Sequence, residues 1–155
     1  MKKFLFLGLL VSLMTSCIIS GSESGTSNPG ATIKTITVSV SKTDWRYTNI
    51  ANNNYFYVGL DLPEITQSVF DRGEVKAYLV VNRNNYSKAR KHLLPYVMHK
   101  EEYISGNWVF WTETIDFTYG KGWCEFNIRA SDFAYELDPN INPEAVEFDI
   151  VITKP

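Results

Sequence analysis

From Ile33 to the end of the chain, apolar and polar residues alternate one by one, and this period of two limits the fold more than any other feature. Ile36, Val38 and Val40 alternate with Thr37, Ser39 and Ser41, for example. Similar alternation recurs within residues 55–62, 75–81, 108–119, 122–129 and 146–152. Successive side chains of an extended chain point to opposite faces of a sheet, so each stretch predicts a half-buried strand. With an edge strand expected at residues 94–97, about seven strands predict an all-β fold, an antiparallel β-sandwich whose immunoglobulin-like or jelly-roll connectivity stays open.

One segment, residues 63–72, has a helical pattern. Proline stands at a plausible first helical position, and Gly73 follows the end of the segment. We expect one short helix of about two turns, with Ile65, Val69 and Phe70 packed inward.

The clearest strand pair lies within residues 108–129 and predicts a hairpin. If Tyr119 lies opposite Gly122, the apolar residues of both strands fall on one face. The same register places Asp116 opposite Glu125 on the outer face, where like charges repel. We therefore expect a neighbouring Lys or Arg, or a bound cation, beside these two carboxylates.

The length of 155 residues and a hydrophobic content of 45% fit one globular domain with a single core. The net charge is −2, and it becomes more negative when Lys2 and Lys3 leave with an N-terminal leader. Nucleic acid is not expected as a partner, because phosphate binding needs a basic surface.

The N-terminus has the pattern of a secretory leader, with a basic start and an apolar run over residues 4–14. The run is too short to cross a membrane, which needs about 20 apolar residues. Thr15, Ser16 and Cys17 resemble the lipobox of bacterial lipoproteins. This resemblance implies cleavage before Cys17 and lipidation of its thiol. Since Ile18, not aspartate, follows the cysteine, the resemblance also implies an outer-membrane location, facing the periplasm or the cell surface.

These patterns divide the chain into three predicted regions: a lipoprotein signal peptide over residues 1–16, a flexible tether over 17–32, and the β-sandwich over 33–155. The tether is predicted because its residues are rich in Gly, Ser and Thr. With Cys17 acylated, Cys124 is the one remaining cysteine, so no internal disulfide forms. Cys124 alternates with Phe126 and is expected to be a buried small hydrophobe.

Catalytic patterns are weak, and we expect no enzyme, no metal and no cofactor. His92 and His99 lie in a polar stretch without a nucleophile motif or metal-ligand spacing, which predicts solvated surface side chains. The carboxylates of Glu113, Asp116 and Glu125 share one hairpin, but they do not converge on a pocket in the predicted register. Residues 138–144 alternate oxygen ligands but lack the glycine of a calcium loop, so they predict an ordinary turn.

Aromatic residues on solvent faces are the one pattern that indicates a ligand site. Trp108 and Trp123 are our first choice for such a site, and Tyr55 and Tyr57 are the second. Aromatic rings stack on sugars and anchor protein interfaces. The alternative is that these side chains only cover the sheet.

Several short motifs, together with the lipobox, resemble small uncharacterised lipoproteins of Gram-negative gut commensals that carry a β-sandwich domain. These motifs are Asp44-Trp45, Leu93-Leu94-Pro95-Tyr96, Ser131-Asp132-Phe133 and the final strand from Phe148 to Ile152. The resemblance implies the fold and the envelope location, and it carries no activity with it.

The leading hypothesis is a lipid-anchored, non-catalytic binding protein of the cell envelope, with a glycan or an envelope protein as its ligand. The alternative is a structural or assembly subunit of an envelope complex that packs through its edge strands. An envelope hydrolase is the third hypothesis.

Overall fold

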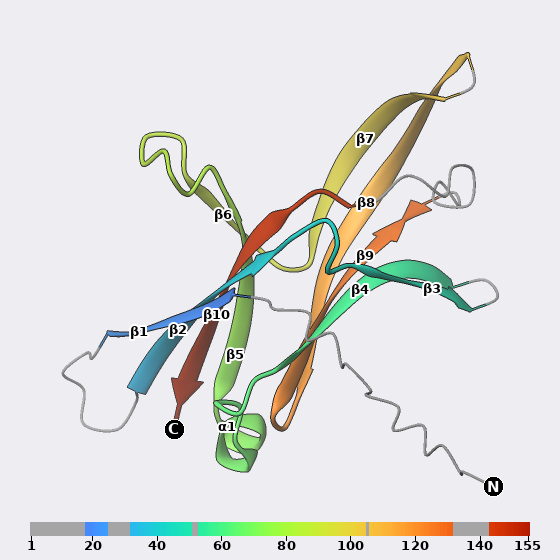
Figure 1. The fold of residues 1–155 in the computed structure, drawn as a ribbon. Coiled ribbons are helices and arrows are strands. Elements are labelled where there is room, and N and C mark those ends of the chain that lie inside the picture. Colours follow the sequence, from blue (N-terminus) through green and yellow to red (C-terminus); the bar gives the residue numbers. More distant parts are fainter. Residues whose placement is uncertain (1–17, 25–31, 51–52, 105, 132–142) are drawn as a thin grey trace, which may run out of the picture.

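The structure, a computed structural model, describes residues 18–24, 32–50, 53–104, 106–131 and 143–155. These residues form two packed antiparallel sheets of five strands each, with one short helix (Figure 1). In order across the first sheet lie β1 (Ile18–Ser24), β2 (Thr32–Val40), β10 (Val146–Lys154), β5 (Glu74–Val81) and β6 (Arg90–Leu93). The second sheet contains β3 (Arg46–Ile50), β4 (Asn53–Asp61), β9 (Trp123–Ala130), β8 (Asn107–Gly120) and β7 (Tyr96–Ile104). The predicted all-β sandwich with one short helix is confirmed.

The strand order supplies the connectivity that the sequence left open. The C-terminal strand β10 lies between β2 and β5, so strands from the two ends of the chain meet in the middle of the first sheet. In the second sheet, β9 lies between β4 and β8. Each sheet therefore combines strands that follow one another along the chain with pairs that are far apart in sequence, which are β2–β10 and β10–β5 in the first sheet and β4–β9 in the second.

The core lies between the sheets and consists of the alternating apolar side chains that the period of two identifies. At its centre the rings of Phe126 (β9) and Phe148 (β10) stack with centroids 3.8 Å apart, and both residues are fully buried. The other large, fully buried apolar side chains are Ile36, Val38, Val40, Leu62, Ile65, Ile115, Cys124, Ile150 and Ile152. Cys124 is a free, buried cysteine, as expected, and burial raises the pKa of its thiol to about 12.

The predicted hairpin exists, but its register was wrong by two residues. Tyr119 pairs with Cys124, not with Gly122. The two-residue turn contains Gly122 at φ +81°, a left-handed conformation that glycine adopts without steric cost. A shift of two residues keeps every side chain on its predicted face. It also separates the like charges, because Asp116 lies opposite Asn127 and Thr118 lies opposite Glu125.

The helix is shorter than predicted. α1 spans Gln67–Arg72, and Thr66 caps it by accepting a hydrogen bond on Oγ1 from the backbone N–H of Val69. It begins after Thr66 and not at Pro63. Val69 is buried as predicted, but Phe70 is 48% exposed and contacts Tyr119 edge-on, so its predicted inward packing is wrong.

Gly73 ends the helix in an extended conformation, so no left-handed turn explains it. A Cβ atom there would lie 2.6 Å from the backbone oxygen of Thr153 in β10. The close approach of helix and strand therefore requires glycine.

The predicted tether is wrong for residues 18–24, which form strand β1 at the edge of the first sheet. β1 pairs with β2 over seven residues, from Ile18 opposite Ser39 to Ser24 opposite Ile33. Strand pairing satisfies backbone groups whatever the side chains are, so a Gly/Ser-rich composition does not exclude it. The leader, Cys17, residues 25–31, and Asp132 and Phe133 of one motif lie outside the described residues.

Replacement of Phe126 by alanine tests the central stack. We expect Phe126→Ala to lower the free energy of unfolding by about 3–5 kcal/mol, because it leaves a cavity against Phe148. The matched control is Phe110→Ala, at a side chain that is 65% exposed and should change stability by no more than about 0.5 kcal/mol. Chemical denaturation of both variants measures the difference, and equal effects would contradict this core.

Candidate functional site

The two tryptophans chosen from the sequence are exposed, but they do not form one site. Trp108 is 61% and Trp123 is 46% exposed, on the outer face of the second sheet. Trp123 pairs with Gly120, which lies twelve residues along β8 from Trp108. At a rise of about 3.3 Å per residue, roughly 40 Å of strand separates the two positions. The prediction of one Trp108–Trp123 cluster is wrong.

The second choice, Tyr55 and Tyr57, lies midway between the tryptophans on the same outer face. The two rings are half-buried, with centroids 6.1 Å apart. The Cζ atom of Arg129, on the neighbouring strand β9, lies 4.2 Å from the centroid of the Tyr55 ring. A guanidinium in this position is attracted by the ring face and holds the ring in place.

Polar side chains on β8 and β9 complete this surface. Asp116 accepts a hydrogen bond from Nδ2 of Asn127 at 3.0 Å and one from Nε of Arg129 at 3.3 Å. Asn127 is only 2% exposed, and its Oδ1 finds no hydrogen-bond partner in the part of the chain that the structure describes. We call the surface formed by Tyr55, Tyr57, Asp116, Asn127 and Arg129 the tyrosine face. It combines two rings with fixed charged and amide groups.

A second aromatic cluster, which the sequence reasoning missed, lies near the tip of the β7–β8 hairpin. Tyr103 pairs with Trp108 across the two strands, with ring centroids 5.5 Å apart, and Phe110 follows on the same face. The exposed fractions are 60% for Tyr103, 61% for Trp108 and 65% for Phe110. Tyr103 lies six residues beyond Val97 and therefore on the same face of the strand, so an extension of the expected strand beyond Val97 would have found the cluster.

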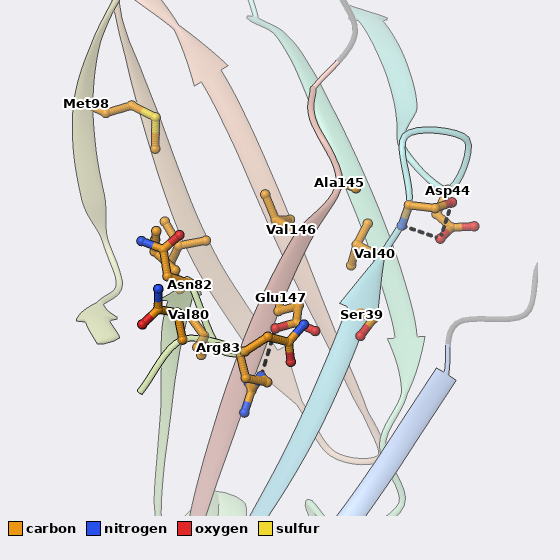
Figure 2. A pocket seen from close by; sticks show the side chains of 15 residues that line it. Ser39, Val40, Asp44, Val80, Asn82, Arg83, Met98, Ala145, Val146 and Glu147 are labelled. Atoms are coloured by element: carbon orange, nitrogen blue, oxygen red, sulfur yellow. Dashed lines mark hydrogen bonds and ion pairs between the residues drawn. The ribbon is translucent and has the colours of Figure 1, made fainter. Parts of the chain in front are cut away.

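An open cleft of about 850 Å³ lies at the end of the sandwich where β2 and β5 end and β10 begins. Its apolar lining includes Val40, Leu79, Met98 and Val146. Figure 2 shows polar groups around them, including Ser39, Asp44, Asn82, Arg83 and Glu147. The carboxylate of Asp44 is already used, since it accepts hydrogen bonds from the backbone N–H and the hydroxyl of Ser41.

Beside the cleft, a buried carboxylate fixes the loop between β5 and β6. Asp149 is 2% exposed and accepts hydrogen bonds from Thr37 (2.8 Å) and Arg83 (2.6 Å), and Lys91 lies 2.8 Å from it. Burial alone would raise the pKa of Asp149, but the hydrogen bonds from Lys91, Arg83 and Thr37 outweigh it and hold the pKa below its ordinary value of 3.8. Arg83 also donates to Glu147 at 2.8 Å. The loop is therefore held near both of its ends, by Arg83 within it and by Lys91 on β6.

The remaining candidate residues are dispersed. His92 stacks on Tyr96 with centroids 4.3 Å apart and is partly buried, so the prediction of a solvated side chain is wrong for it, whereas His99 is exposed. Glu113 is buried, and it accepts a hydrogen bond from Nε1 of Trp111 at 3.3 Å. Among the described residues, no group of three or more His, Cys, Asp or Glu is placed to hold a metal ion.

No helix within those same residues is long and apolar enough to span a membrane.

Comparison of the chain with protein-family models, with curated proteins and with solved structures finds no match.

The Asp149 cluster predicts a specific pH dependence of stability. We expect Asp149→Asn to lower the free energy of unfolding at neutral pH by about 3 kcal/mol, because Arg83 and Lys91 lose a buried partner charge. A carboxylate with a lowered pKa stabilises the fold above its ordinary pKa, and this contribution is lost as the pH falls through the lowered value. The difference between the wild type and the variant should therefore shrink below pH 3.8.

Glu147→Gln is the matched control, since its more exposed carboxylate should contribute less than about 1 kcal/mol. Denaturant titrations over a pH series measure both variants. A difference for Asp149→Asn that is independent of pH would contradict the ionised cluster.

Proposed function

We propose that this protein is a lipid-anchored, non-catalytic binding protein of the cell envelope, and that the tyrosine face binds a glycan. The observation that carries the proposal is the pair of tyrosine rings on one side of the second sheet, with Arg129 held over one ring. Asp116 fixes this arginine from the neighbouring strand. The surface is thus organised before a ligand arrives, which lowers the entropic cost of binding.

The chemistry of the tyrosine face suits a sugar. A pyranose ring presents an apolar C–H face, which stacks on aromatic rings, and hydroxyl groups at its rim. The Arg129 guanidinium donates and the Asp116 carboxylate accepts, so both kinds of hydroxyl contact are available. Asn127 lies beneath this surface, where its side-chain amide donates to the Asp116 carboxylate and helps to fix it.

Two of the four edge strands, β6 and β7, give little support to assembly through edge strands, the alternative hypothesis. β6 has only four residues, and β7 carries Lys100, Glu101 and Glu102. Short or charged edge strands are the devices by which proteins avoid edge-to-edge pairing. Neither strand offers the long apolar edge that a subunit of this kind needs.

The anchor part of the proposal depends on the sequence. The basic start, the apolar run and the small residues before Cys17 are the features of a lipoprotein leader. Two or more acyl chains at one residue anchor a protein stably, whereas one chain does so only marginally. We place the protein in the outer membrane because Ile18 follows the cysteine.

A glycan array with the detergent-purified protein tests the tyrosine face. We expect Tyr55→Ala and Tyr57→Ala each to weaken binding by about fivefold or more, since truncation of a central aromatic residue costs over about 1 kcal/mol. Tyr57→Phe keeps the ring and should retain most of the affinity. Trp123→Ala is the matched control, because this exposed ring lies at the far end of the same sheet and should leave the signal unchanged.

Two results would overturn the glycan assignment. One is array binding that both tyrosine variants retain. The other is an empty array combined with a tyrosine-dependent pull-down from envelope extract, which would assign the surface to a protein partner.

Metabolic labelling with a fatty-acid analogue tests the anchor. We expect the wild-type protein and Cys124→Ser to incorporate the label, because the buried Cys124 is not the acylated residue. Cys17→Ser should lose the label completely. Mass spectrometry of the mature N-terminus checks the result independently, and an unmodified Cys17 would contradict the anchor.

A further inference from the structure

Strand β1, the first described segment of the chain, begins at one end of the sandwich. Ile18, which directly follows Cys17, pairs with Ser39, and Ser39 pairs with Glu147. The same row continues across the first sheet to Val80 and Lys91. Ser39, Val80 and Glu147 all line the open cleft. A lipid on Cys17 would therefore leave the fold at the cleft end.

The β7–β8 hairpin projects from this same end. Met98 lines the cleft, and Tyr103 lies five residues further along β7, roughly 17 Å beyond it at about 3.3 Å per residue. Figure 1 shows the hairpin extending past the other strands, away from α1 and the C-terminus. The exposed Tyr103–Trp108 pair therefore lies well beyond the cleft, near the tip of the hairpin.

The loop between β5 and β6, residues 82–89, also leaves the cleft end (Figure 1). Its Tyr86 is 96% exposed. Arg83 and Lys91 are bound to Asp149, whereas Lys88 and Arg90 are exposed and form no ion pair with the described residues. The buried cluster therefore fixes a loop that carries the exposed Lys88 and leads into the exposed Arg90 of β6.

We propose that the cleft end of the sandwich docks on a lipid bilayer with anionic headgroups. This inference rests on the lipid anchor of the proposed function. Trp108 and Tyr103 enter the interfacial layer, because amphipathic rings are most stable at headgroup depth. Lys88 and Arg90 bind headgroup phosphates, and each basic residue near such a surface contributes about fivefold to the ratio of docked to undocked protein.

Two acidic residues set the depth of the contact. Glu101 lies opposite Phe110 and Glu102 lies opposite Val109, just below the Tyr103–Trp108 pair. Carboxylates do not enter the acyl region, so insertion stops at the tip pair and Phe110 remains among the headgroups.

This orientation leaves the tyrosine face available to a ligand. Arg129 pairs with Thr114 on the outer face of the second sheet, six residues along β8 from Trp108. The tyrosine face therefore lies roughly 20 Å from the tip, on the side of the molecule and not at its docked end.

Fluorescence quenching in vesicles tests the docking. The acylated full protein is reconstituted in vesicles of phosphatidylethanolamine and phosphatidylglycerol that carry bromine near the headgroups, and tryptophan emission is measured. We expect Trp108→Phe to lose most of the quenching and Trp123→Phe to lose none. The pair is matched, because both residues are exposed tryptophans on one sheet and only Trp108 lies at the docked end.

A charge-reversal pair tests the basic loop in the same vesicles. We expect Lys88→Glu with Arg90→Glu to reduce the docked fraction and the quenching of Trp108, and we expect the reduction to disappear when phosphatidylglycerol is omitted. Lys121→Glu with Lys154→Glu is the matched control, since these residues lie at the opposite end of the sandwich and should have no effect.

Flotation of the vesicles separates the two proposals. Protein that floats but shows no quenching of Trp108, or equal quenching of Trp108 and Trp123, overturns the docked orientation and leaves the anchor intact. Protein that does not float overturns the anchor, and this orientation with it. Quenching that is lost in Trp108→Phe and weakened by reversal of the loop charges supports the orientation.

Discussion

The stack of Phe126 on Phe148 is the contact on which the rest of the structure depends. It joins the second sheet to the first at the centre of the core, with ring centroids 3.8 Å apart. The described residues contain a single cysteine, so no covalent link between the sheets assists it. Burial of apolar surface must therefore hold the two sheets together. The outer faces of the sheets take no part in this packing. The outer face of the second sheet carries the tyrosine face and the exposed aromatic residues of the β7–β8 hairpin.

Local periodicity predicted the fold class because the alternation of apolar and polar residues within each strand shows which face of that strand is buried. The alternation of Ile36, Val38 and Val40 and that of residues 146–152 needed no knowledge of partners. Register was different: Tyr119 could face Gly122 or Cys124 with the same side chains inward, and only the geometry of the Lys121-Gly122 turn decides between them. β1 was missed because its stability comes from backbone pairing with β2, which leaves no apolar pattern.

The candidate site was predicted in part for the same reason. The sequence identified Trp108, Trp123, Tyr55 and Tyr57 as outward-facing, and all four lie on one sheet face. It did not show that the tryptophans are twelve residues of strand apart, since that distance depends on where each strand begins and ends. Nor did it show Arg129 over Tyr55 or the Asp149 cluster, because these contacts join residues separated by many positions along the chain. Long-range pairing sets such contacts, and a single sequence does not contain it.

The position of β1 has a mechanical consequence. If Cys17 carries the lipid, any pull between the membrane and a ligand held by the domain is transmitted through Ile18 and along the axis of β1. The hydrogen bonds between antiparallel strands run perpendicular to that axis. Force along the strand therefore acts in shear on all seven residue pairs of β1 and β2 at once. Their hydrogen bonds cannot break one after another from one end of the strand. In an anchored molecule, the pairing of edge strand β1 with β2 therefore resists a pull on the lipid without the help of a disulfide bond.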